Sequence, residues 1–210
     1  MNLYLSQFLA YSSEIVPVIA SLAYSSRLPR TIIFFSWYLI LSLSVSILSA
    51  YLSLHRIHNL WISNVFIPIQ FTMLAYFFSL HLSNIWKQIA RLSIPAFILF
   101  VSIDFAFFES VSALTPYAKS IDYTLLTFVA ALSLSAMYRQ NLTQITSEPL
   151  FWIASAMIIY CASSAVLFSL SSTFLKISIE TLKLAISLQA IIFVVSNLLL
   201  TGAFFCLRRR

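Results

Sequence analysis

The sequence predicts an all-α integral membrane protein, a bundle of seven transmembrane helices with its N-terminus outside and its C-terminus in the cytoplasm. Three observations lead to this prediction: the composition, the length of the apolar runs and the distribution of Lys and Arg. Of the 210 residues, 61% are hydrophobic and 9% are charged, whereas soluble domains average roughly 45–50% and about 25%. The mean hydropathy of +0.96 therefore excludes a soluble globular protein, a disordered chain and a disulfide scaffold.

Seven runs are long enough to cross a bilayer, since one spanning helix needs about 20 mainly apolar residues. We expect a single transmembrane domain over residues 1–210, with helices near 3–24, 31–53, 59–81, 92–108, 120–138, 150–171 and 181–206. The first run ends before Pro29, because the residue before a proline resists the α conformation. The fourth run is the shortest and the seventh the longest. Ser147, Glu148 and Pro149 open the sixth with a capping residue, an acid and a first-turn proline.

The orientation follows from the basic residues, which are more frequent on the cytoplasmic side of membrane proteins. Eight would lie on one side: Arg27, Arg30, Lys87, Arg91, Arg139, Arg208, Arg209 and Arg210. Four would lie on the other: Arg56, Lys119, Lys176 and Lys183. We therefore expect a multi-pass protein of the cell membrane in this orientation.

Several kinds of site are excluded by composition and spacing. The single glycine, Gly202, rules out Gly-rich phosphate loops and G-x-x-x-G helix pairing. Cys161 and Cys206 form no C-x-x-C, and the three histidines lack metal-ligand spacing. We expect no metal, no cofactor, no catalytic residue and, because the basic residues are dispersed between apolar runs, no nucleic-acid partner.

Glu14 is the acidic residue placed deepest in the expected bilayer, and such residues are functional candidates because their insertion is costly. Gln7, Glu14 and Ser21 are seven apart and so form one polar stripe facing the bundle. Glu14 is either a carboxylate that binds a proton or cation, or a bonded side chain that pins two helices. We expect an inward side chain with a polar partner among Gln189, Asn197, Asn64 and Gln70.

Asp104 lies in the outer third of the fourth helix, near Glu109 and level with Asp122. These carboxylates could line a cavity open to the outside. Alternatively, they are interfacial acids in contact with water beside Lys119, which is the interpretation that we favour.

The third and seventh helices carry the remaining candidates. Asn64 and Gln70 lie in the third helix, and Pro68 should bend it, because proline removes the bond to the carbonyl of Asn64. Gln189 and Asn197 lie in the seventh helix. Each amide is either part of a ligand- or proton-binding site or a hydrogen-bonding contact between helices.

The run over residues 59–71, which contains Asn59-Leu60-Trp61 and Pro68-Ile69-Gln70-Phe71, resembles a motif of small seven-helix bacterial integral membrane proteins of uncharacterised function. Outside this run the likeness is one of length and hydropathy. The resemblance implies the seven-helix plan, a location in the bacterial inner membrane and no particular chemistry.

The sequence favours two functions. The first is a sensory, signalling or ligand-binding module that acts through a cytoplasmic or membrane partner protein, because cytoplasmic loops of about 7, 10 and 11 residues are too short for a catalytic output. The second is a transporter of a small solute, or one coupled to protons, with a polar site at mid-membrane. An enzyme and a purely structural role are less favoured, and the sequence leaves the oligomeric state open.

Overall fold

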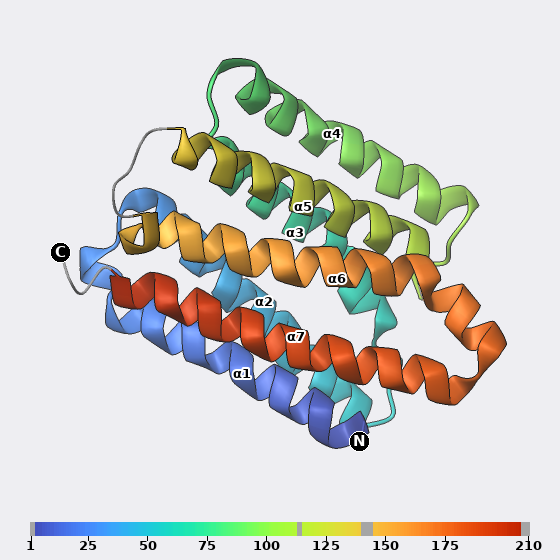
Figure 1. Cartoon of the computed structure of the whole chain (residues 1–210). Helices are drawn as coiled ribbons and strands as arrows, with labels where there is room; N and C mark the ends of the chain where they lie inside the picture. Colours follow the sequence, from blue (N-terminus) through green and yellow to red (C-terminus); the bar gives the residue numbers. More distant parts are fainter. Residues whose placement is uncertain (1–2, 113–114, 140–144, 207–210) are drawn as a thin grey trace.

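The computed structural model describes residues 3–112, 115–139 and 145–206. Over these residues the chain contains α-helices, short 3-10 turns and no strands. The helices are α1 (Leu3–Ala23), α2 (Arg30–Leu54), α3 (Leu60–Ser79), α4 (Asn84–Phe107), α5 (Pro116–Tyr138), α6 (Pro149–Ile177) and α7 (Ile179–Cys206), as labelled in Figure 1. The predicted all-α fold is thus confirmed.

Six of these helices, α2 to α7, are long and apolar enough to cross a membrane. In α1 the apolar stretch is shorter and covers Phe8–Ala23. Pro149 stands in the first turn of α6, as predicted. Pro116 stands in the first turn of α5, which begins four residues before the predicted start. The helix continues on both sides of Pro68, and the bend there stays a prediction.

Two helices differ from their predicted bounds by more than four residues. α4 begins at Asn84 rather than near 92, so the shortest of the seven is α3, with 20 residues. α6 extends to Ile177 and is the longest, with 29 residues. These predicted bounds are wrong because a basic residue does not by itself end a helix in this chain. Arg91 instead lies within α4, with its guanidinium 5.7 Å from the centre of the Tyr76 ring.

Six helices form a closed ring and the seventh lies outside it. Contacts run from α1 to α2, α3, α5, α6, α7 and back to α1, whereas α4 packs mainly on α3. In Figure 1, α4 accordingly forms one edge of the bundle. We call the end at which α1, α3, α5 and α7 begin the N-end and the opposite end the C-end.

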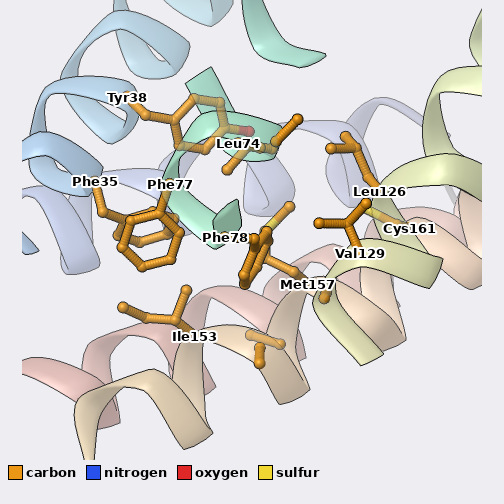
Figure 2. Close-up of a cluster of buried hydrophobic side chains, with 14 of the residues drawn as sticks. Phe35, Tyr38, Leu74, Phe77, Phe78, Leu126, Val129, Ile153, Met157 and Cys161 are labelled. Carbon is orange, nitrogen blue, oxygen red and sulfur yellow. The ribbon is translucent and has the colours of Figure 1, made fainter. Parts of the chain in front are cut away.

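The half of the ring towards the C-end is filled with large apolar side chains. Phe35, Phe77, Phe78 and Ile153 have no exposed surface, and Met157 is 3% exposed. Figure 2 shows these five residues, which we call the apolar plug, meeting between α2, α3 and α6. The rings of Phe35 and Phe77 lie 5.0 Å apart, centre to centre. This close packing fills the centre of the ring towards the C-end.

Candidate functional site

A cavity of about 290 Å³ occupies the half of the ring towards the N-end, and all six ring helices contribute to its wall. We call it the central cavity. Its polar lining consists of Glu14, Ser42, Ser46, Ser49, Ser63, Gln70, Lys119 and Gln189. Its aromatic lining consists of Tyr11, Tyr38, Phe66, Tyr123, Tyr160 and Phe193. A concave, largely apolar site with a few convergent polar groups is typical of small-molecule binding.

Glu14 projects from the middle of α1 and is 7% exposed, as expected for an inward-facing side chain. The Ser42 hydroxyl of α2 donates to Oε1 of Glu14 at 2.9 Å. Its other oxygen, Oε2, has no hydrogen-bond partner among the described residues. The expectation of a polar partner is therefore confirmed. The expected identity of that partner is wrong, because a serine supplies the bond where an amide was expected.

The α3 amides bond to the region around the start of α5. Asn64 is fully buried and donates to the carbonyl of Val111 at 2.7 Å, while it accepts from the Thr115 hydroxyl at 2.9 Å. Asn64 thereby anchors the connection between α4 and α5. Gln70 lines the central cavity and donates to Oδ2 of Asp122 at 2.9 Å, so it joins α3 to α5.

The α7 amides bond to the two helices that flank α7. Gln189 lines the central cavity and donates to the Ser164 hydroxyl of α6. Asn197 donates to the Ser13 hydroxyl of α1 at 2.8 Å. Ser13 is adjacent to Glu14 in the chain, yet its side chain meets α7 while that of Glu14 meets α2. The structure thus brings Glu14, Gln70 and Gln189 to one cavity, and Asn64 and Asn197 do not line it.

Lys119 was treated as a topology marker, but it lines the central cavity and is only 8% exposed. Its ammonium donates to the Ser63 hydroxyl at 3.3 Å and lies 5.2 Å from the centre of the Phe168 ring. The carboxyls of Glu109 and Asp122 are close enough to attract its charge. A lysine in the first turn of a helix carries no sequence signal that separates a buried ammonium from a surface one.

The carboxyls of Asp104, Glu109 and Asp122 do not line the central cavity. Asp104 is 4% exposed and Asp122 is fully buried, so the prediction that they contact water is wrong for both. The side chains of Asp104 and Asp122 face neighbouring helices, although we expected them to face water at the membrane surface. Glu109, between α4 and α5, accepts from the backbone amide of Tyr117 at 3.2 Å. Burial raises the pKa of Glu109, and the nearby carboxyl of Asp104 raises it further.

The tyrosines form the part of the wall that borders the closely packed half of the ring. Tyr123 and Tyr160 approach each other to 3.4 Å between hydroxyl oxygens, and their rings meet edge to face. The ring of Phe193 lies 5.0 Å from that of Tyr160. Tyr38 lies one turn of α2 from Phe35 of the apolar plug and contacts its ring. The central cavity therefore ends where the apolar plug begins.

Another hollow, of about 620 Å³, lies towards the C-end beside the connection between α3 and α4. It contains His81 and Arg139. Burial lowers the pKa of His81, although the bond between its ring and the Phe77 carbonyl opposes this shift. The hollow is thus lined by one permanent cation and mainly apolar side chains. Its polar lining residues, His81, Ser83, Ser135 and Arg139, include no carboxyl, whereas Glu14 brings a buried carboxyl with an unpaired oxygen to the central cavity. We therefore take the central cavity as the stronger candidate site.

Within the described residues, no three His, Cys, Asp or Glu side chains are grouped so that they could hold a metal ion. Comparisons of this chain with protein-family models, with curated proteins and with solved structures found no match. The resemblance carried by residues 59–71 therefore stays a prediction. Any conclusion about function has to rest on the central cavity itself.

Proposed function

We propose that the protein is a ligand-binding membrane module: a seven-helix bundle that takes up a small molecule into the central cavity from the outer face of the membrane. The orientation rests on the Lys and Arg count, by which the N-end is the outer end. One observation carries the proposal. Glu14 offers a buried carboxyl with an unoccupied oxygen to a cavity that all six ring helices line.

The energetic argument for a ligand is the free energy lost by burying Oε2 of Glu14 without a hydrogen-bond partner. A buried polar group without a partner costs about 1–3 kcal/mol, and more when it is charged. A protein that needed Glu14 only to join α1 to α2 would obtain the same bond with Ser42 from a neutral side chain. The free oxygen is useful if a bound molecule completes its hydrogen bonding.

We favour a receptor over a transporter because the central cavity ends at the apolar plug. A ligand that enters from the N-end meets Tyr38 and then closely packed Phe35, Phe77 and Phe78. In the alternative function, a transporter of small solutes, the same apolar plug would be the closed inner gate of an outward-facing state. The two functions differ in whether the plug opens.

The response to a ligand would pass to a partner protein. At the C-end the segments between helices comprise residues 24–29, 80–83 and 139–148. Segments of this length can contact a partner but are too short to fold into a catalytic domain of their own.

The test is a thermal-unfolding screen of the purified protein in detergent micelles against small cations, anions, zwitterions and neutral solutes. A ligand at 100 times its Kd stabilises the native state by about 2.7 kcal/mol. Ser46→Trp places an indole into the cavity and should abolish the stabilisation. Ser44→Trp is the matched control, because Ser44 lies on the exposed side of the same helix.

Stabilisation of the wild type and of Ser44→Trp, but not of Ser46→Trp, is the expected result. If no class of solute stabilises the wild type, or if Ser46→Trp responds like the wild type, the cavity is not a binding site. If a ligand does stabilise the wild type, measurement of its flux into proteoliposomes separates a transporter from a receptor.

A further inference from the structure

The two charged side chains that line the central cavity differ in how their charges are balanced. Lys119 has the carboxyls of Glu109 and Asp122 nearby, and its ammonium bonds to Ser63. Glu14 interacts with the hydroxyls of Ser42 and Ser46, and no ion pair joins it to a basic residue within the described part of the chain. The charge that is left for a ligand to balance is therefore the negative charge of Glu14.

Three tyrosine side chains line the same cavity as this carboxyl. Tyr11, Tyr38 and Tyr160 all line the central cavity, and all are near enough to Glu14 to interact with its charge. The negative face of an aromatic ring attracts an organic cation within about 6 Å of its centre. A carboxylate alone suits many cations, whereas a carboxylate among ring faces suits a cation that carries hydrocarbon.

We propose that the ligand of the central cavity is a small organic ammonium ion, held by an N–H bond to the free oxygen of Glu14 and by the tyrosine rings. This proposal rests on the proposed function and adds the class of ligand. The cavity volume of about 290 Å³ lies at the lower limit of the roughly 300–1,000 Å³ usual for ligand sites. It therefore suits an amine with at most one or two rings.

The experiment is isothermal titration calorimetry on the full-length protein in micelles, with butylamine, phenethylamine and tryptamine as probes. Phenethyl alcohol and 3-phenylpropionate are the neutral and anionic counterparts of phenethylamine, and sodium chloride tests an inorganic cation. We expect at least one amine to bind, and its neutral counterpart to bind at least tenfold more weakly.

Two variants assign the binding to this site. Glu14→Gln keeps the shape of the side chain and should weaken amine binding at least tenfold. Glu180→Gln is the matched control, since Glu180 is an exposed acid paired with Lys183 at the start of α7, and it should bind like the wild type. Tyr11→Leu removes one ring and should weaken binding about three- to tenfold. Circular dichroism and thermal unfolding establish that each variant is folded.

The outcomes separate this inference from the proposed function. If 3-phenylpropionate or the alcohol binds more tightly than the amine, in a manner that Ser46→Trp abolishes, the cavity binds ligands but not as an ammonium site. The same conclusion follows if sodium alone binds, or if the amine binds equally to Glu14→Gln. If no probe binds in a manner sensitive to Ser46→Trp, both proposals fail.

Discussion

Gln70→Leu should destabilise the protein, because it removes the amide that bonds to a fully buried carboxyl. Gln70 donates to Oδ2 of Asp122 at 2.9 Å, and Oδ1 of Asp122 has no hydrogen-bond partner among the described residues. After the substitution, both oxygens of Asp122 would lack a partner, while leucine fills nearly the same volume as glutamine.

The size of the effect can be bounded. Leaving a buried polar group unpaired costs about 1–3 kcal/mol in soluble proteins. Hydrogen bonds between transmembrane helices are worth about 0.6 kcal/mol on average and up to about 1.7, because the reference state in the membrane also finds partners. Asp122 is fully buried, so we expect Gln70→Leu to cost about 1.5 kcal/mol, near the upper limit.

A double-mutant cycle makes the reasoning specific to this pair. Asp122→Leu should cost less than Gln70→Leu, since the freed Gln70 amide faces the central cavity. The double variant should also cost less than Gln70→Leu alone, because replacing both partners by apolar groups removes the unpaired carboxyl. The assay is reversible unfolding of the purified protein in mixed micelles, followed by circular dichroism.

Gln88→Leu is the matched control: Gln88 is exposed on α4, and its replacement should change the free energy of unfolding by less than about 0.5 kcal/mol. The reasoning is refuted if Gln70→Leu is as mild as this control. It is also refuted if the costs of the two single variants simply add in the double variant.

Three further predictions follow from other parts of the molecule. Asn64→Ala should release the connection between α4 and α5, so that hydrogen exchange becomes faster at the Tyr117 amide, which bonds to Glu109 across this connection, while the rest of the bundle is unchanged; equal exchange in both proteins would contradict this. The raised pKa of Glu109 means that the native state holds its proton more tightly than the unfolded chain does. Stability should therefore decline as pH rises above about 4.3, the ordinary pKa of glutamate, and Glu109→Gln should remove this decline from a titration of the unfolding free energy. A green fluorescent protein fused after Arg210 should fluoresce in bacterial cells and alkaline phosphatase there should be inactive; the reverse pattern would invert the orientation.

The helices were predictable because each apolar run is long and is ended by polar or proline residues. Those signals are local, and they located most helix boundaries to within a few residues. They failed at α4, where Lys87 and Arg91 stand inside the helix. Long basic side chains can extend from a membrane helix to the interface, so that a charge does not by itself mark the end of a span.

The inward orientation of Glu14 was also predictable, since only that rotation of α1 avoids an unpaired carboxyl in hydrocarbon. Its partner was not. The choice between Ser42 and an amide depends on which helices are neighbours and on how each is rotated, and neither quantity is set by the pattern within one helix. Serine recurs along α2, so nothing distinguished Ser42 from Ser44, whose hydroxyl bonds to the Ile40 carbonyl within its own helix.

The pairing of α1 with α7 also has a consequence for synthesis. α4 can dock on α3 as soon as both have left the ribosome, because they are consecutive in the chain. Of these seven helices α1 is made first and α7 last, yet the two are neighbours in the ring, and the bond between Asn197 and Ser13 joins residues 184 positions apart. Until α7 is inserted, Glu14 lies in an open arc of helices beside lipid or the insertion machinery. A nascent chain halted before α7 would therefore contain most of the polar lining but no enclosed cavity.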